Sequence, residues 1–414
     1  MKKTLYVAAA FCFLTKLTAQ TVNFTESKLP IVILNTNGQT IPDPYKITID
    51  MQIIWNGDGK INKMTDAPNN YNGKIGIELR GSTSQDLSPK KPYSLELRDA
   101  KGSSKDVALL GMPKESDWDL IAPYSDKTLI RDALTYKLAS LFMAWAPRTR
   151  FCELVLNGTY QGVYVLTEKI KRGKDRVDIS KADSTILTGD PLTGGYILKI
   201  DKFTGETPGI PNSFKSVYSN SATNQKTTYI YHYPKPENIK IEQRVYINAL
   251  VAEFEKTMSS DKFADPSVGY AKYFDVQSLV DFLIVNELTH NVDGYRLSTY
   301  FYKDRNSVNP KFQMGPVWDF NIALANADYC NGSTVAGWAF DFNTVCPSDG
   351  WGVPFWWSRL LSDINFRKQF RNRWKQLRTN ELSIPKINGL IDSMNTTLNG
   401  ASARNFQQWL ISDG

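Results

Sequence analysis

Two aspartates, Asp293 and Asp319, are the residues of this sequence best suited to do chemistry. Asp319 follows the apolar run Pro-Val-Trp, where burying an unpaired carboxylate would cost several kcal/mol. Segments 298–303 and 311–317 have the composition of two strands, and DRNSVNP between them is typical of a turn. A hairpin of this kind brings the residues before its first strand beside those after its second. We therefore expect Asp293 and Asp319 to lie close together in space.

Two neighbouring carboxylates share a proton, act as an acid and a base, or bind a divalent cation. Mg²⁺ prefers oxygen ligands and commonly keeps phosphate oxygens in its coordination shell, so the pair predicts metal-dependent phosphate chemistry. The alternative is structural: each aspartate caps a turn or pairs with Arg296 or another basic residue.

A phosphate site also needs positive charge and backbone donors. The loop RGSTS (80–84), followed by Lys90 and Lys91 at the start of a strand, supplies both, because small residues let the backbone approach an anion. The loop matches neither GxxxxGK[ST] nor GxGxxG, so an ordinary polar hairpin tip is the alternative interpretation.

The first half of the chain has the patterns of an antiparallel sheet with one inserted helix. Strand-like pieces occur within residues 20–60, and segments 74–80 and 92–98 alternate apolar and polar residues on either side of the polar loop. Apolar residues at helical spacing follow over 126–142. Asn157-Gly158 then predicts the turn of a second hairpin.

The second half is predicted to be mostly helical. Apolar residues recur at helical spacing over 241–258 and 276–290, and again near the end at Phe366, Phe370 and Trp374. The strand pair described above is the only break in this pattern that we predict.

The first 19 residues combine a basic start, a short apolar run and a small-residue end, as in a secretory signal. This apolar run is too short to stay in a membrane, and no later run approaches the roughly 18 apolar residues that a spanning helix needs. We therefore predict a secreted, periplasmic or cell-surface location without a stable membrane span.

The composition excludes several classes of function. Loss of the three lysines in the signal lowers the formal net charge from +7 to +4, and this mild charge argues against nucleic acid as a partner. His232 and His290 are the only histidines, so a three-histidine zinc site is impossible. Export favours a disulfide between Cys330 and Cys346, which flank a loop rich in small polar residues, and leaves Cys152 as a buried free thiol.

Several sequence blocks follow one another in an order that resembles a known family. The blocks are RGSTS…PKKPYSLEL, DWDLIAPYSDKTLIRDAL, NGTYQGVYVLTEK, NELTHNVDGYRLSTYFYKD and GPVWDFN. Together they are similar to the CotH family, the spore-coat-protein-H-like atypical protein kinases, from about residue 75 to the end. The resemblance implies ATP- and divalent-metal-dependent phosphorylation of Ser/Thr in a protein substrate.

The resemblance also implies an α+β, atypical protein-kinase-like fold of two lobes. The first lobe would hold an antiparallel sheet plus one helix, and the second would be mostly helical with a catalytic β-hairpin. Combined with the patterns above, this divides the chain into a signal peptide (1–19), an N-terminal β extension (20–73), a nucleotide-covering first lobe (74–170), and a hinge with the second lobe (171–414).

Matching positions carry the implied roles. Asp293 takes the place of the catalytic aspartate that orients or deprotonates the acceptor hydroxyl, and Asp319 that of the metal-binding aspartate. ATP, with Mg²⁺ or Mn²⁺, would be held by a set of residues from the first lobe: Lys91 at the phosphates, Arg80, Gly81 and Ser82 in the cover over the nucleotide, and Glu168 near adenine.

Two other functions fit parts of the sequence. Kinases often place an asparagine about five residues after the catalytic aspartate, but Ser298 and Thr299 stand here, and no glutamate on the 126–142 helix can pair with Lys91. These departures favour a catalytically inactive kinase-like scaffold as the alternative. A carbohydrate-active enzyme is the other alternative, since tryptophans such as those in PFWW (354–357) stack on sugars.

Overall fold

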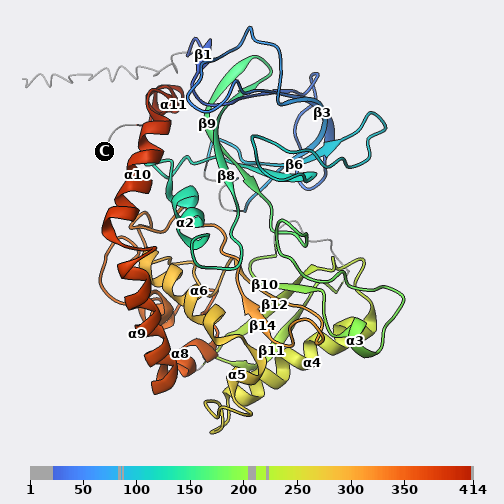
Figure 1. Cartoon of the computed structure of the whole chain (residues 1–414), viewed down its shortest axis with the longest axis vertical. Helices are drawn as coiled ribbons and strands as arrows, with labels where there is room; N and C mark the ends of the chain where they lie inside the picture. Colours follow the sequence, from blue (N-terminus) through green and yellow to red (C-terminus); the bar gives the residue numbers. More distant parts are fainter. Residues whose placement is uncertain (1–21, 83–84, 86–87, 204–210, 221–222, 412–414) are drawn as a thin grey trace, which may run out of the picture.

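The computed structural model describes residues 22–82, 85, 88–203, 211–220 and 223–411. The fold is mixed α+β: a β-barrel lies at one end of the molecule, and a second sheet with most of the helices lies at the other (Figure 1). The predicted signal peptide, residues 1–19, is outside the described residues. Across the described part of the chain, every helix is too short or too polar to cross a membrane.

Seven strands close the barrel, and an additional two-stranded ribbon pairs β1 (Glu26–Ser27) with β4 (Asn62–Lys63). Around the barrel the order is β2 (Ile31–Asn35), β3 (Ile47–Ile54), β5 (Tyr71–Leu79), β6 (Tyr93–Arg98), β7 (Asp117–Ile121), β9 (Thr159–Glu168) and β8 (Thr149–Leu156). The two predicted hairpins, β5–β6 and β8–β9, are confirmed. The prediction of a purely antiparallel sheet is wrong in one respect, because a parallel pairing of β2 with β8 closes the barrel.

Alternation along the strands separates an apolar interior from a polar outer face. Ile77, Leu95 and Trp118 lie opposite one another on β5, β6 and β7, and all three are fully buried inside the barrel. The next positions along these strands, together with one position on the adjacent β9, point outward and form the outer polar row: Glu78, Ser94, Asp119 and, on β9, Thr167. The predicted boundary at residue 74 falls within β5, and β2 and β3 from before that boundary belong to the same barrel.

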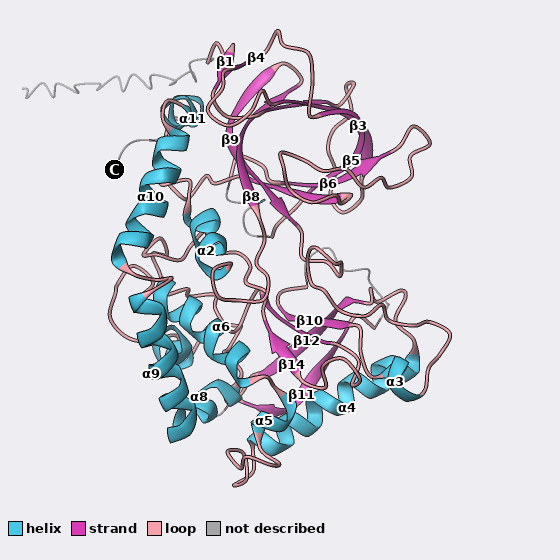
Figure 2. Cartoon of the chain, in the orientation of Figure 1, coloured by secondary structure: helices cyan, strands magenta, loops and turns pink. Residues whose placement is uncertain are grey.

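The second sheet is antiparallel throughout. Its order is β11 (Ser213–Ser219), β12 (Lys226–Tyr233), β10 (Tyr196–Ile200), β13 (Thr299–Lys303) and β14 (Phe312–Met314). The predicted hairpin is confirmed as β13–β14, with Phe301 opposite Met314. The expectation that only this strand pair interrupts the second half is wrong, because β11 and β12 extend the sheet on the far side of β10 (Figure 2).

The helices surround this sheet and extend to the barrel (Figure 2). They are α2 (Arg131–Ala139), α3 (Gly189–Leu192), α4 (Ile241–Met258), α5 (Tyr270–Tyr273), α6 (Val276–Thr289), η1 (Ala339–Asp341), α7 (Phe342–Val345), α8 (Phe355–Ser362), α9 (Ile364–Thr379), α10 (Ile384–Leu398) and α11 (Ala401–Trp409). The predicted helix over 241–258 has the expected bounds, whereas α2 covers only the middle of the predicted 126–142.

An aromatic core packs between the second sheet and its helices. Trp356 and Trp357 are 1% and 0% exposed, so neither ring is available to stack on a sugar. Trp357 meets the ring of Tyr295 edge-on, with 4.7 Å between centroids, and the Tyr295 hydroxyl donates to Glu287 Oε1 at 2.6 Å. This core therefore supports the turn that carries Asp293, two residues before Tyr295.

The C-terminal helices α9, α10 and α11 run along one side of the molecule from the second sheet to the barrel (Figure 1). At the barrel, α11 packs on β9 through a buried polar cluster. Lys90 Nζ donates to the Val163 carbonyl at 2.5 Å and to Asn405 Oδ1 at 2.7 Å. Gly162 permits this approach, because a Cβ on it would lie 2.4 Å from Asn405 Oδ1. The two lysines at 90 and 91 thus point to different places.

Burial of Lys90 predicts a distinctive dependence of stability on pH. Desolvation lowers the pKa of Lys90 to about 7, while the charge of Glu153 opposes the shift. Above pH 7 the native state loses the Lys90 proton, but the unfolded state keeps it up to a pKa of about 10.4. The unfolded state then binds more protons, so this group makes the protein more stable as pH rises from 7 to 10.

Urea unfolding of wild type and Lys90→Met between pH 7 and 10 measures this contribution. The difference in unfolding free energy between the two proteins should change in favour of wild type, by up to about 1.4 kcal/mol per pH unit. Other titrating groups cancel in that difference. Parallel pH curves for the two proteins would show that Lys90 remains protonated in the native state.

Candidate active site

Asp319 lies in the turn that follows β14, and helix α2 holds the backbone of that turn. The Asp319 N–H donates to the Tyr136 hydroxyl at 2.9 Å. The Phe320 N–H donates to Asp132 Oδ1 at 2.6 Å. Asp319 has a positive φ of 64°, which aspartate tolerates better than most residues and which often marks a functional position. α2 therefore fixes the backbone from which the solvent-exposed Asp319 side chain projects.

Burial and mutual repulsion raise the pKa values of the carboxylates around this turn. Burial raises the pKa of Asp132 to about 7, and the charge of Asp319 adds to the rise. The Asp319 carboxylate is accessible to solvent, but the protein packed around it partly desolvates it and so raises its pKa to about 6. The charge of Arg80 opposes that second shift, whereas those of Asp293 and Asp201 increase it. Such a site attracts a cation.

Arg80, directly after β5, is the basic residue beside these acids. Its Nε lies 3.3 Å from Asp119 Oδ2, and its guanidinium stands over the Trp318 ring at 5.5 Å. Burial alone would lower the pKa of Arg80, but the charges of Asp119 and Asp319 raise it overall. Among the described residues, no acceptor takes a hydrogen bond from its two terminal nitrogens, and the side chain is 24% exposed. Arg80 is therefore placed to bind an anion in bidentate fashion.

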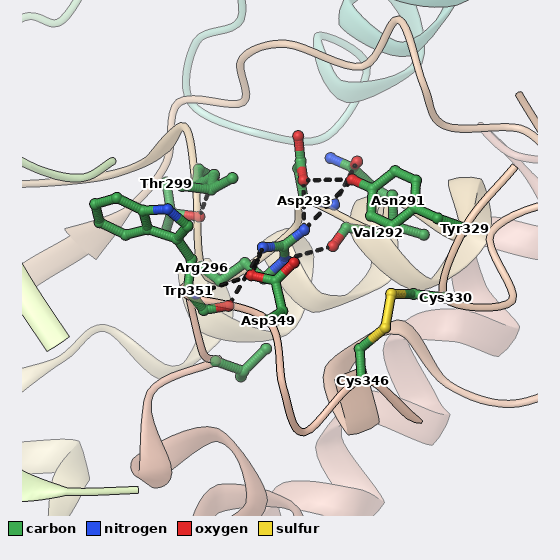
Figure 3. A network of polar contacts seen from close by, with 12 residues as sticks. Asn291, Val292, Asp293, Arg296, Thr299, Tyr329, Cys330, Cys346, Asp349 and Trp351 are labelled. Atoms are coloured by element: carbon green, nitrogen blue, oxygen red, sulfur yellow. Dashed lines mark hydrogen bonds and ion pairs between the residues drawn. A yellow bond between two sulfur atoms is a disulfide. The ribbon is translucent and has the colours of Figure 1, made fainter. Parts of the chain in front are cut away.

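Asp293 lies in the turn between α6 and β13 (Figure 3). Its Oδ1 accepts a hydrogen bond from Arg296 Nη2 at 2.7 Å and another from the Tyr329 hydroxyl at 3.1 Å. The Asp293 N–H donates to Asn291 Oδ1 at 3.2 Å. The pairing with Arg296 that the sequence left as an alternative is thus present. It engages Oδ1, and the second carboxylate oxygen points away from this network (Figure 3).

The β13–β14 hairpin brings the two aspartates within electrostatic reach. The Gly315 N–H donates to the Tyr300 carbonyl at 2.8 Å and closes the open end of the hairpin. The charge of Asp293 contributes to the raised pKa of Asp319. Asp201, at the end of the neighbouring strand β10, acts on both carboxylates in the same sense. The charges of Asp201, Asp293 and Asp319 therefore act on one another.

Lys91 holds the predicted nucleotide-covering loop together. Its Nζ donates to the Gln85 carbonyl. Gln85 in turn donates from its backbone N–H to the Ser82 carbonyl at 2.9 Å and from its side chain to the Gly81 carbonyl at 2.8 Å. Lys91 is thus engaged within this loop, whereas the charges of Arg80 and Lys202 act on Asp319.

Glu168 is fully buried, and both of its carboxylate oxygens accept hydrogen bonds from Arg148. The Arg148 N–H donates to Oε2 at 2.9 Å, and Arg148 Nη1 donates to Oε1 at 2.7 Å. Burial raises the pKa of Glu168. A contact between Glu168 and adenine stays a prediction, and it would require Glu168 to exchange one of these hydrogen bonds.

The sequence patterns did not single out Asp119, Asp132, Asp201 or Tyr329. Two of the four had a usable signal. Asp119 alternates with Trp118 in a strand, so it had to face outward, and Asp201 directly follows the strand-like run YILKI of β10. Asp132 and Tyr329 reach the site only through tertiary contacts, with Phe320 and Asp293 respectively.

Phosphate chemistry implies a metal ion and a nucleotide, and both would need ligands among the side chains of this site. In the described part of the chain, no three carboxylate, histidine or cysteine side chains form a group able to hold a metal ion by themselves. Mg²⁺ is, however, usually held by one or two carboxylates together with water and substrate phosphates. The exposed Asp319, whose carboxylate is repelled by the charges of Asp293 and Asp201, fits such a site. The buried Asp119 Oδ1, which has no hydrogen-bond partner, also fits a site that a bound group completes.

Comparison with protein families matches residues 77–413 to the family described as CotH kinase protein. The chain belongs to the CotH kinase family. This confirms the resemblance drawn from the sequence blocks. A search of curated proteins finds no match. The range that matches the CotH kinase family begins within β5 and includes Arg80, Asp293 and Asp319.

Proposed function

We propose that this protein is an exported atypical protein kinase that transfers the γ-phosphate of ATP to Ser or Thr of a secreted or surface protein. Mg²⁺ or Mn²⁺ is the proposed metal. The observation that carries the proposal is that the charges of Arg80, directly after barrel strand β5, and of Asp293, before β13 of the second sheet, both act on Asp319. An acid for the metal, a cation for phosphate and an acid for the hydroxyl are the parts that phosphoryl transfer needs. Membership of the CotH kinase family supports the same reaction.

Each residue has a distinct role in this proposal. Asp319 would hold the metal, with Asp201 as a neighbouring carboxylate, and the metal would neutralise charge on the phosphates. Arg80 would bind phosphate oxygens through its two open nitrogens, while Asp119 keeps its Nε in place. Asp293 would accept the proton of the acceptor hydroxyl on Oδ2, because Oδ1 is held by Arg296.

The proposal gives the barrel and the second sheet the parts of two kinase-like lobes. The barrel, with its outer polar row and Arg80, would cover the nucleotide, and the second sheet with its helices would carry Asp293 and Asp319. Contacts of α2 with the turn after β14 support this arrangement, since they join the helix between β7 and β8 to the metal-binding position.

Export to an oxidising compartment is part of the proposal. The Cys330–Cys346 disulfide is present as predicted, and Cys152 is free and buried. Disulfides persist mainly in secreted, periplasmic and surface proteins, which supports the location suggested by the first 19 residues.

An inactive kinase-like scaffold is the second candidate, and one observation favours it. Thr299, near the position where kinases place a metal-binding asparagine, is 1% exposed, and its hydroxyl donates to the Leu297 carbonyl at 3.0 Å. Thr299 is therefore not available as a second metal ligand, and a scaffold of this kind would bind metal and ATP poorly.

Transfer of label from γ-labelled ATP to a generic protein acceptor and to the chain itself tests the proposal. Label is expected with Mg²⁺ or Mn²⁺ and not with a chelator. Arg80→Met is expected to lower kcat/KM by about 10²-fold, as when one charged donor to a transition state is removed. Lys91→Met is the matched control. Its kcat/KM is expected to remain within about threefold of wild type, because Lys91 contacts the Gln85 carbonyl within the loop.

Arg80→Lys keeps a charge beside Asp119 and separates loss of the guanidinium fork from loss of folding. Its kcat/KM is expected to fall about tenfold, while its thermal unfolding temperature stays near that of wild type. A larger loss from Lys91→Met than from Arg80→Met would return the phosphate role to Lys91. Absence of metal-dependent label in wild type would favour the scaffold.

A further inference from the structure

The hydrogen bond from Tyr329 to Asp293 comes from a loop with little regular structure, between residues 321 and 338. The Tyr329 side chain is 39% exposed, so it is not held by burial in the core. Its hydroxyl donates to Asp293 Oδ1, the same oxygen that Arg296 contacts, and lies 3.4 Å from Arg296 Nη2. Tyr329 therefore needs another restraint to stay beside the aspartate.

The Cys330–Cys346 disulfide supplies that restraint. Cys330 directly follows Tyr329, and Cys346 directly follows helix α7, with 5.7 Å between their Cα atoms. The α7 side of the bridge is fixed, because Glu287 accepts hydrogen bonds from the Ala339 N–H at 2.8 Å and the Phe340 N–H at 3.0 Å. The bridge thus ties the irregular loop that carries Tyr329 to an anchored segment (Figure 3).

The segment that follows Cys346 contacts the other terminal nitrogen of Arg296. Asp349, three residues after Cys346, accepts a hydrogen bond from Arg296 Nη1 at 3.0 Å. The ring of Phe342, in α7, lies 3.8 Å from the Arg296 guanidinium. The disulfide therefore brings together Tyr329 and Asp349, the two residues that flank the Asp293–Arg296 pair (Figure 3).

We propose that Tyr329 is a positioning residue for Asp293 and that the Cys330–Cys346 disulfide keeps it in place, so that phosphate transfer depends on the oxidised state of this cysteine pair. The proposal rests on the proposed function. Tyr329 and Arg296 together hold Oδ1 and leave Oδ2 directed away from them, toward an acceptor hydroxyl. Reduction frees Tyr329, and the Asp293 carboxylate then rotates between orientations of which only some are productive.

Three proteins test the proposal: Tyr329→Phe, the double variant Cys330→Ser/Cys346→Ser, and the triple combination. Tyr329→Phe is expected to lower kcat by about tenfold and to leave the KM for ATP within twofold, since Tyr329 touches Asp293 and no group proposed to bind phosphate. The double variant is expected to lose a similar factor. Tyr45→Phe, at a hydroxyl that is also solvent-exposed but lies on the barrel side, is the matched control.

The triple variant distinguishes positioning from general damage. If the bridge acts by holding Tyr329, the losses are not additive, and the triple variant is only about as slow as the double variant. A dithiol should slow wild type to the same level, because it gives two electrons and two protons to the cystine, forms two thiols and closes to its own cyclic disulfide. The same dithiol should not affect the double variant.

Amide hydrogen exchange over residues 290–297 separates failure of this proposal from failure of the proposed function. Faster exchange in the double variant than in wild type is expected whether or not label is transferred. An active wild type with undiminished kcat in Tyr329→Phe and the double variant would overturn the proposal and leave the kinase function intact. If wild type is inactive, the kinase function fails, and equal exchange over 290–297 in both proteins would overturn the positioning role as well.

Discussion

Replacing Asp319 by asparagine is expected to lower the rate of phosphate transfer by at least about 10³-fold, a loss of about 4 kcal/mol of transition-state stabilisation. The change removes one negative charge and almost no volume. Asparagine adopts a positive φ as readily as aspartate, so the φ of 64° at this position is retained. The hydrogen bond from the backbone N–H to Tyr136 does not involve the side chain and is retained as well.

The measurement is the initial rate of label transfer at saturating metal and ATP, together with the rise in Tm on adding metal and ATP. Wild type should gain thermal stability from the metal–nucleotide complex, because a ligand that binds only the native state stabilises it. Asp319→Asn should lose both transfer and that gain. Asp58→Asn, at an exposed aspartate of the barrel, is the charge-matched control and should behave as wild type.

Removal of this charge also reports on the surrounding acids. Asp319 contributes to the raised pKa of Asp132, so the pKa of Asp132 should fall toward its ordinary value in the variant. Retention of more than a tenth of the wild-type rate in Asp319→Asn would assign the metal to other carboxylates, with Asp293 and Asp201 the first candidates.

The parts of the site that the sequence predicted are local in the chain. The β13–β14 hairpin was predicted from two strand-like segments joined by turn residues. Asp293 precedes this hairpin in the sequence, and Asp319 follows it. The disulfide was predictable from the signal-like N-terminus, which implies export, and from the small-polar loop that Cys330 and Cys346 flank. Local patterns of this kind do not depend on the rest of the fold.

The parts that the sequence did not predict depend on contacts between distant segments. Closure of the barrel needs β2 beside β8, more than one hundred residues later, and no local pattern specifies that pairing. The side chains of the neighbours Lys90 and Lys91 point in different directions. Lys90 binds Asn405, which lies 315 positions away in the sequence, so no local pattern shows which lysine is buried. The resemblance gave Lys91 the phosphates and Arg80 a place in the cover over the nucleotide, and the structure adds that the charge of Arg80 acts on Asp319.

Strands β11 and β12, which we did not predict, are a different case, because their sequences do contain strand-forming residues. The segment of β12, KTTYIYHY, is rich in β-branched and aromatic residues, and β11, SFKSVYS, also contains Phe, Val and Tyr. The helical periods on either side favoured a helical interpretation of the whole half. β10 pairs with both β12 and β13. This places Asp201, directly after β10, near the start of β13, which Asp293 precedes.

Replacing Asp293 by asparagine is expected to lower kcat by about 10²- to 10⁴-fold, the usual range for loss of a general base. Asparagine keeps an oxygen that can accept the hydrogen bonds from Arg296 and Tyr329, so the turn should remain folded. It cannot accept a proton from the acceptor hydroxyl. The rise in Tm with metal and ATP should be preserved, because Asp293 is not proposed as the metal ligand, and this separates it from Asp319→Asn.

The pH dependence of kcat provides a second, independent test of the same role. Burial raises the pKa of Asp293, and the charge of Arg296 only partly opposes the shift. A base acts in its deprotonated form, so kcat should fall as pH decreases through this raised pKa, at a higher pH than for an ordinary aspartate. In Asp293→Asn the residual activity should lose this acidic limb. An unchanged limb in the variant, or a kcat within tenfold of wild type, would mean that Asp293 serves to hold Arg296 and that another group aligns the hydroxyl.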